Sequence, residues 1–340
     1  MFHIFFDNHQ TVRPKVLGTT FSQLQCKYLK LDYLECLKSL CALPFDVIRI
    51  SAYWDEIETH PNSFDYSVLD TIFQQISNTN LKIILCLGIK VPRWPEFHIP
   101  KYLREKYDIN KKNQTIDNYD EITQKSSDFL KQTILRYKNN PQLKYFLIEN
   151  EGLNNAEFTK GRHLSYGFIR SQVNLVNLLK LPTQRVMCTN AIDLLPPWSK
   201  DGDYIKQSTQ LADAVGINVY NKVPASDNVY IEPSIFYWHK LNSWKNYIRS
   251  QGREVWITES QAEPWEKYNG KGTVVHTKNI HNPSSSPESA IALSSRLVRI
   301  GFDNILLWGC EHWYYHKKNN RSWWWDMIQS YAKKNDINQL

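Results

Sequence analysis

The chain has 340 residues, of which 42% are hydrophobic and 22% charged, an ordinary globular composition that excludes a disordered protein. A chain of this length can bury a large core, so its stability does not need disulfide bonds. The formal net charge of +7 comes from scattered lysine and arginine residues without a nucleic-acid-binding motif, which indicates a solvated surface and no nucleic-acid partner.

The cysteines and the apolar runs bear on metal binding and location. The six cysteines show no metal-ligand spacing, and Cys86 and Cys188 lie in apolar runs typical of strands. We therefore predict a reduced protein with no metal site and no disulfide framework. No apolar run approaches the roughly 18 residues of a membrane helix, and the first residues do not resemble a signal peptide. These features predict a cytoplasmic protein without a membrane span.

Strand-like and helix-like patterns alternate along the chain. Short apolar runs typical of strands lie at residues 15–22, 46–51, 81–88, 143–148, 185–189, 214–220, 253–259 and 305–309. Helical spacing of apolar residues lies at 31–43, 65–77, 165–179, 234–250, 289–300 and 323–333, with another helix through Phe129 and Leu135. Eight such repeats predict a parallel sheet closed into a barrel.

The predicted fold class is therefore α/β, a single (β/α)8 TIM barrel with elaborated βα loops. It forms one catalytic domain over 1–340, with a lead-in at 1–14 and the barrel at about 15–334. Two loops after strands are long: an aromatic one at 91–100 and a polar one at 267–286. The 12 Trp and 19 Tyr residues suit a site that stacks on sugar rings, although packing accounts for most of them.

Two of the predicted strands deliver glutamates to their C-terminal ends. Glu149 and Glu151 follow the run at 143–148, and Glu259 ends the run that begins at residue 253. Catalytic residues of α/β barrels lie at this end of the strands, so we predict a site with two carboxylates. Glu149 competes with Glu151, because residues two apart share a strand face. Glu263 competes with Glu259, although it lies four residues further into the loop.

Five stretches, taken in chain order, resemble the retaining β-glycosidases of clan A, a large superfamily of (β/α)8 barrels, and especially a cellulase-like branch within or near family five. These stretches are residues 47–50 with 53–58, 90–95, 149–151, 258–265 and 307–313. The resemblance implies that Glu151, which directly follows Asn150, is the acid/base and that Glu259 is the nucleophile. Gly152 is a departure, since the clan often has proline there.

The resemblance also implies supporting residues. Arg49 matches the arginine beneath the nucleophile, Tyr220 the tyrosine that hydrogen-bonds it, and Asn150 the residue that contacts the sugar 2-hydroxyl. Arg49 also fits a purely structural ion pair. Trp308 is best placed as a platform for the sugar, because it ends the last strand. The remaining candidates for substrate contact or support are Trp54, Trp94, Trp313, Glu263 and Glu311, and both Trp308 and Trp313 also fit core positions.

This set of residues suits glycosidic cleavage with retention, which uses two carboxyl groups about 5 to 5.5 Å apart. Arg49 would keep Glu259 ionised, while burial and the negative nucleophile would keep Glu151 protonated near neutral pH. The sequence therefore predicts a retaining β-glycoside hydrolase with a carbohydrate substrate and no cofactor. Two alternatives stay open: a transglycosidase that uses the same site, and a non-catalytic carbohydrate-binding barrel.

Overall fold

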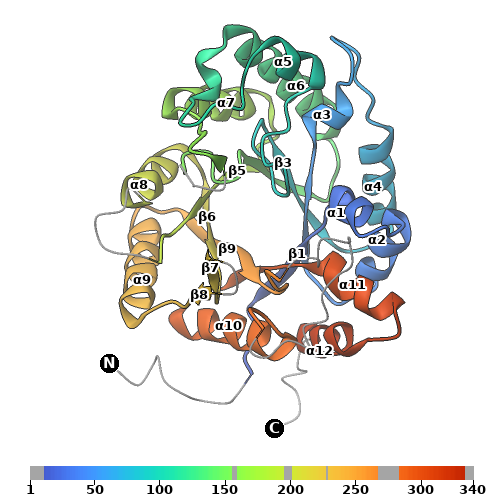
Figure 1. Ribbon diagram of the computed structural model, residues 1–340, viewed down its shortest axis with the longest axis vertical. Helices are drawn as coiled ribbons and strands as arrows, with labels where there is room; N and C mark the ends of the chain where they lie inside the picture. The colour runs from blue at the N-terminus through green and yellow to red at the C-terminus, as the bar shows by residue number, and fades with distance from the viewer. Residues whose placement is uncertain (1–10, 155–158, 195–200, 227–228, 267–282, 334–340) are drawn as a thin grey trace.

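The computed structural model describes residues 11–154, 159–194, 201–226, 229–266 and 283–333, and it contains a closed barrel of eight strands (Figure 1). The barrel strands are β1 (Val16–Thr20), β2 (Val47–Ser51), β3 (Lys82–Leu87), β4 (Leu143–Ile148), β5 (Arg185–Ala191), β6 (Ala214–Val219), β9 (Glu254–Gln261) and β10 (Asn304–Trp308). All neighbouring pairs are parallel, and β10 closes on β1 from Val16↔Asn304 to Thr20↔Trp308. The predicted (β/α)8 barrel is confirmed, and each strand lies within about two residues of its predicted range.

A ring of helices surrounds the barrel (Figure 1). The helices are α1 (Gln23–Tyr28), α2 (Tyr33–Cys41), α3 (Trp54–Ile57), α4 (Ser67–Ser77), α5 (Lys101–Lys106), α6 (Asp120–Tyr137), α7 (Tyr166–Leu179), α8 (Asp201–Leu211), α9 (Ile235–Ser250), α10 (Pro287–Ile300), α11 (Cys310–Lys318) and α12 (Trp323–Ala332). A 3-10 turn, η2 (Ile116–Asn118), and an antiparallel hairpin of β7 (Val223–Ser226) and β8 (Val229–Ile231) lie in the loops.

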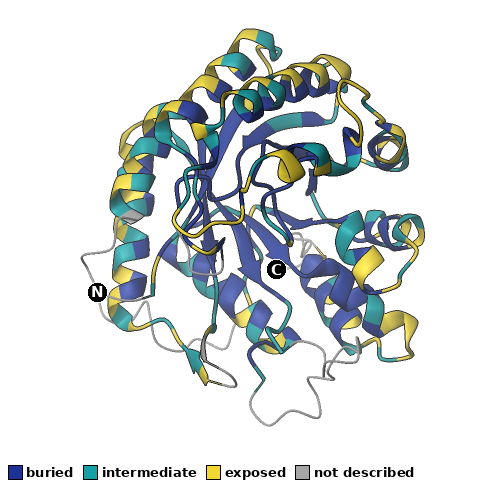
Figure 2. Cartoon of the chain, turned by 45° about the horizontal axis from the view of Figure 1, so that its top comes forward, coloured by how far each residue is buried: buried dark blue, intermediate teal, exposed yellow. Residues whose placement is uncertain are grey.

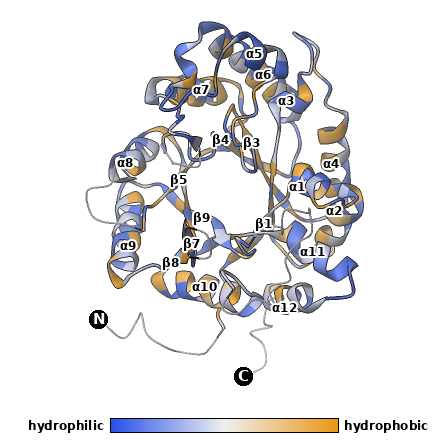
Figure 3. Ribbon diagram, in the orientation of Figure 1, coloured by the Kyte–Doolittle hydropathy of each residue, from blue (hydrophilic) through white to orange (hydrophobic). Residues whose placement is uncertain are grey.

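The apolar side chains form two layers because successive strand residues point to opposite faces. Inside the barrel lie Val47, Ile84, Leu147, Met187, Ala214, Trp256 and Leu306. Outside it, residues such as Ile83, Leu85 and Phe146 join the core beneath the helices. The strands are buried, and the exposed residues lie mostly on the outer sides of the helices and in the loops (Figure 2). The helices carry hydrophobic residues on one side and hydrophilic residues on the other, as Figure 3 shows.

Local chemistry explains where some elements depart from their predicted bounds. Helix α10 begins at Pro287 rather than at 289, because Ser286 and Ser289 form a capping box and proline suits the first helical position. The short helices α1, α3 and α5 and the longer helices α8 and α11 were not predicted. The sequence of α8 is mostly polar and that of α11 mixes charged and aromatic residues, so neither shows an apolar stripe.

Some predicted features lie outside the described residues: the loop at 267–286 up to residue 282, and the ends of the predicted domain at 1–10 and 334–340. The six cysteines are free thiols. None of the described helices has the length and apolar character required to cross a membrane.

Candidate active site

An extra residue in β9 sets the direction of the Glu259 side chain. Ile257 pairs with Ile217 of β6, and the next pair joins Glu259 to Asn218, so the register shifts at Thr258. The pairing of β9 with β10 shifts over the same segment. Such bulges re-aim side chains beside active sites. Two consecutive residues of β9 therefore reach polar groups at the barrel mouth, and Thr258 Oγ1 donates to Asn218 Oδ1 at 2.7 Å.

Both carboxylate oxygens of Glu259 are hydrogen-bonded, and the residue is 2% exposed. Arg49 Nη2 donates to Oε1 at 2.7 Å, and the Tyr220 hydroxyl donates to Oε2. Arg49 is completely buried, and its Nε donates to Thr20 Oγ1 at 2.8 Å, which fixes the guanidinium. The two contacts that the resemblance implied are thus present. The ion pair holds a negatively charged carboxylate at the end of β9.

Glu151 lies at the end of β4, and its environment differs from that of Glu259. Its Oε1 accepts a hydrogen bond from Asn218 Nδ2 at 2.6 Å. Burial raises the pKa of Glu151 above its ordinary value, and the charge of Glu259 adds to this effect, while Lys90 opposes it. A carboxyl group with a raised pKa holds its proton to higher pH, as a general acid requires. Glu259 therefore pairs with a buried arginine, whereas burial raises the pKa of Glu151.

Glu149, the alternative to Glu151, has a structural role. Its carboxylate accepts hydrogen bonds from the backbone N–H groups of Ile89 and Lys90, at 2.9 and 2.6 Å, and from Gln172 Nε2 at 2.7 Å. Gly88 makes room for it, since a Cβ atom there would lie 2.3 Å from the Glu149 carboxyl carbon. Glu149 thus attaches the loop after β3 to the end of β4.

That loop also contacts Glu151 directly. Lys90 is completely buried, and its Nζ donates to the backbone carbonyl of Glu151 at 2.9 Å. The backbone N–H of Asn150 donates to the Lys90 carbonyl at 2.6 Å. On the other side of β4, Thr189 Oγ1 accepts from the Glu151 N–H at 2.9 Å and donates to Asn150 Oδ1 at 3.2 Å. The loop after β3 and residues of β5 therefore fix the segment with Asn150 and Glu151 from both sides.

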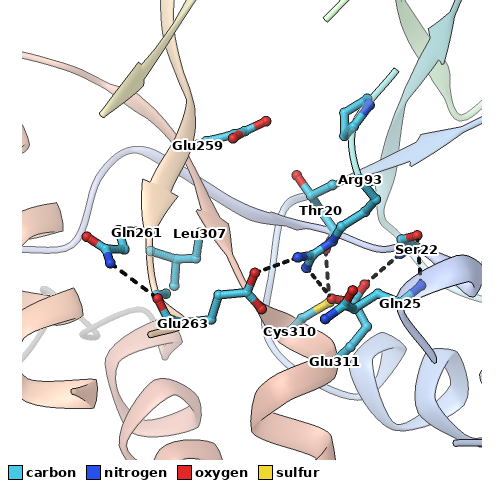
Figure 4. Close-up of polar contacts among 12 residues, drawn as sticks. Thr20, Ser22, Gln25, Arg93, Glu259, Gln261, Glu263, Leu307, Cys310 and Glu311 are labelled. Carbon is cyan, nitrogen blue, oxygen red and sulfur yellow. Dashed lines mark hydrogen bonds and ion pairs between the residues drawn. The ribbon is translucent and has the colours of Figure 1, made fainter. Parts of the chain in front are cut away.

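Arg93, in the loop after β3, joins the segment after β9 to helix α11 at the same end of the barrel (Figure 4). One nitrogen of its guanidinium contacts Glu263 at 2.5 Å and the other contacts Glu311 at 2.7 Å. The guanidinium carbon also lies 3.9 Å from the centre of the Trp308 ring, a cation–π distance. Glu311 is completely buried and also accepts from the Ser22 N–H at 2.6 Å. Glu263 and Glu311, both candidates from the sequence, therefore bind Arg93.

The tryptophan candidates take different positions. Trp54 is completely buried and stacks on Phe129 with ring centres 5.8 Å apart, so the structure does not bring it to the site. Trp313 is also buried, and its Nε1 donates to the Ala262 carbonyl at 2.6 Å, which supports the end of β9. Trp94 is 71% exposed on the loop after β3, and Trp308 is 8% exposed beneath Arg93.

Several polar residues of the site had no role in the sequence analysis. These are Lys90, Arg93, Glu96, Gln172 and Asn218. Asn218 carried a usable signal, because it interrupts an apolar strand just before its C-terminal end. Lys90 and Arg93 lay within a recognised stretch, but their partners are distant in sequence. Within the described residues, no group of three or more His, Cys, Asp or Glu side chains could hold a metal ion.

Comparisons with known proteins agree with the barrel fold. A family model described as beta-galactosidase, Glyco_hydro_42, matches residues 35–166. A β-galactosidase from the haloarchaeon Halorubrum lacusprofundi has a TM-score of 0.58 at 11% identity, over 86% of this chain and 52% of that chain. GH5_18 from Streptomyces cattleya, solved with GlcNAc, has a TM-score of 0.59 at 12% identity, over 88% and 71%. Xylanase 10B from Thermotoga maritima has a TM-score of 0.55 at 10% identity, over 86% and 82%. A search of the curated proteins finds no match.

The resemblance to the clan A glycoside hydrolases is confirmed. The structural likeness shows the shared barrel, and the chain spans about half the length of the Halorubrum β-galactosidase. The glycoside hydrolase family match at 35–166 includes Arg49, the loop after β3 and Glu151, and it ends before Glu259. One half of the carboxylate pair therefore lies inside the matched segment, and the other half is assigned from the geometry of β9.

Proposed function

We propose that this protein is a retaining β-glycoside hydrolase that cleaves a β-linked glycoside or oligosaccharide by double displacement. The observation that carries the proposal is the pair of buried carboxyl groups at the ends of β4 and β9. Glu259 is held as an anion by Arg49, whereas burial and the charge of Glu259 raise the pKa of Glu151. Two carboxyl groups in opposite environments are the requirement for acid and nucleophile in one site.

In the first step, Glu259 attacks the anomeric carbon and the bond to the departing oxygen breaks. Glu151 gives its proton to that oxygen, so the leaving group departs neutral. A glycosyl ester on Glu259 remains. Formation of the ester removes the negative charge of Glu259, which lowers the pKa of Glu151, because that charge had raised it.

In the second step, Glu151 acts as a base, which suits its lowered pKa. It takes a proton from a water molecule as the water oxygen attacks the anomeric carbon. The ester bond breaks, Glu259 returns to the carboxylate bound by Arg49 and Tyr220, and Glu151 is protonated again. Each step inverts the configuration at the anomeric carbon, so the product has the configuration of the substrate.

Asn150 is the proposed contact for the sugar 2-hydroxyl. Its Oδ1 accepts a hydrogen bond from Thr189, which leaves the Nδ2 group as the donor. A donor in this place strengthens its hydrogen bond as the oxocarbenium-like state develops. We propose that the substrate is a carbohydrate, and the proteins of similar structure suggest which sugars to test: galactosides, xylosides, and glycosides of mannose and N-acetylglucosamine.

The test is mass spectrometry of the intact protein after exposure to 2-deoxy-2-fluoro glycosides of galactose, xylose, glucose and mannose that carry activated leaving groups. The fluorine slows breakdown of the glycosyl ester, so the intermediate accumulates. We expect one adduct, which peptide mapping places on Glu259, and no adduct on the Glu259→Gln variant. An adduct on another carboxylate, or a product of inverted configuration by NMR, would contradict the proposal.

A further inference from the structure

Glu96 is a third carboxyl group near the catalytic pair, and the mechanism above gives it no role. It lies in the loop between β3 and α5, is partly buried and has a left-handed backbone with φ of 72°. Among the described residues, its carboxyl group has no hydrogen-bond or ion-pair partner, in contrast to Glu149, Glu263 and Glu311.

The backbone around Glu96 is fixed relative to both catalytic carboxyl groups. Residues 89–98 form a hairpin: the Glu96 N–H donates to the Arg93 carbonyl at 2.9 Å, and the Glu96 carbonyl accepts from the Val91 N–H at 3.0 Å. The Lys90 side chain ties one strand of this hairpin to the Glu151 carbonyl. Arg93 ties its turn to Glu263, just beyond β9. Glu96 therefore belongs to a rigid segment attached at both sides of the site.

Glu96 interacts electrostatically with the groups around it, in agreement with the position of its hairpin between the attachments of Lys90 and Arg93. Burial raises its pKa to about 8, the charges of Glu151 and Glu259 add to the rise, and Lys90 and Arg93 oppose it. The charge of Glu96 also acts on Tyr220, whose hydroxyl donates a hydrogen bond to Glu259. Burial and the two catalytic glutamates raise the pKa of the Tyr220 hydroxyl, and Glu96 contributes to that rise.

We infer that Glu96 is a substrate-binding residue whose carboxyl group hydrogen-bonds a hydroxyl of the sugar held between Glu151 and Glu259. A partly buried carboxyl group without a partner is unfavourable, and a sugar hydroxyl satisfies it whether it is protonated or ionised. The site then selects glycosides that carry this hydroxyl, because its loss leaves the carboxyl group unpaired. Asn150 serves the 2-hydroxyl, so Glu96 serves one of the others. The inference rests on the proposed hydrolase function.

The experiment is a cycle of enzyme variants and monodeoxy substrates. It uses the aryl β-glycoside that the wild type hydrolyses and its 3-, 4- and 6-deoxy analogues, with the wild type, Glu96→Ala and Glu96→Gln. We expect the wild type to lose about 10- to 100-fold in kcat/KM on one analogue, and Glu96→Ala to lose a similar factor on the parent glycoside. For Glu96→Ala, kcat/KM on that analogue should equal its kcat/KM on the parent glycoside. On the other two analogues, Glu96→Ala should lose the same factor in kcat/KM as the wild type.

A matched control is Glu105→Ala in the neighbouring helix α5, where the exposed Glu105 side chain pairs only with Lys101 at 3.4 Å. This variant should behave as the wild type. Labelling of Glu259 by the fluoro glycoside shows that each variant is folded. If Glu96→Ala fails to fold, Glu96→Gln takes its place in the comparison. Glu96→Gln should lose part of the discrimination between the parent glycoside and the deoxy analogue. Wild-type penalties on all three analogues in both Glu96 variants would overturn the inference and leave the hydrolase proposal intact. If the wild type neither hydrolyses any of the glycosides nor forms a covalent adduct with any of them, the proposed function is overturned, and the inference with it.

Discussion

The proton on Glu151 matters only when the departing oxygen needs it. A leaving group that is stable as an anion, such as dinitrophenolate, departs without protonation, whereas an alkoxide does not. We therefore expect Glu151→Ala to cleave an alkyl glycoside about 10²- to 10⁴-fold more slowly than the wild type, while formation of the glycosyl ester from a dinitrophenyl glycoside changes little. Pre-steady-state release of the phenolate measures this first step. Equal losses on both substrates would remove Glu151 from the role of acid.

Burial is the main cause of the raised pKa of Glu151, and the charge of Glu259 adds to it. Both effects raise the pKa of Glu151, so this carboxyl group should stay protonated above the ordinary pKa of a glutamate. As pH rises through this raised pKa, kcat/KM should fall, because the proton needed by the leaving group is lost. In Glu259→Gln, which has lost the neighbouring negative charge, the pKa of Glu151 should be lower. Carboxyl carbon NMR titration of both proteins measures the shift, and an unchanged pKa would show that the two groups do not interact.

At the scale of elements, Arg93 connects the loop after β3 to the segments after β9 and β10. Glu311 is completely buried, so removal of the guanidinium leaves its charge without its ion-pair partner. We expect Arg93→Ala to lower the free energy of unfolding by about 3 to 5 kcal/mol. The double variant Arg93→Ala/Glu311→Gln should recover part of this loss, because the buried charge is gone. Urea unfolding of the four proteins of this cycle gives the values, and additive losses would contradict the coupling.

The same connections show what the sequence could and could not predict. The strands and the placement of Glu151 and Glu259 were readable, because a short apolar run ending in a polar residue is a local pattern. The contact between Arg93 and Glu263 joins residues 170 positions apart, and no local pattern encodes it. The bulge at Thr258 was equally hidden, since it is defined by the register of β9 against β6. The place of Glu96 in the hairpin of residues 89–98 was hidden as well, because it depends on backbone contacts that the sequence does not show.

At the scale of the whole molecule, the two ends of the barrel differ in the side chains they carry and in their expected function. The carboxyl pair lies at the C-terminal ends of the strands, and the opposite end is closed by a separate cluster. There, Glu254 accepts from the Tyr145 hydroxyl at 2.7 Å and from Trp256 Nε1 at 3.1 Å, and it pairs with Arg185. The Tyr145 and Trp256 rings meet edge to face with centres 5.2 Å apart. Among the described contacts, none joins these side chains to Glu151 or Glu259, so we expect them to contribute to stability.

This separation predicts that stability can be lowered without loss of catalysis. Trp256 is 4% exposed and fills the barrel interior, so Trp256→Leu should leave a cavity and lower the free energy of unfolding by about 2 to 4 kcal/mol. At 25 °C the folded fraction should keep wild-type kcat/KM, since β4 and β9 keep their C-terminal contacts. Urea unfolding and steady-state kinetics on the same preparation measure both quantities. Phe236→Leu is the control, because Phe236 is 80% exposed on α9 and its loss should change neither. A parallel fall of kcat/KM in Trp256→Leu would show that packing at the closed end determines the geometry of Glu151 and Glu259.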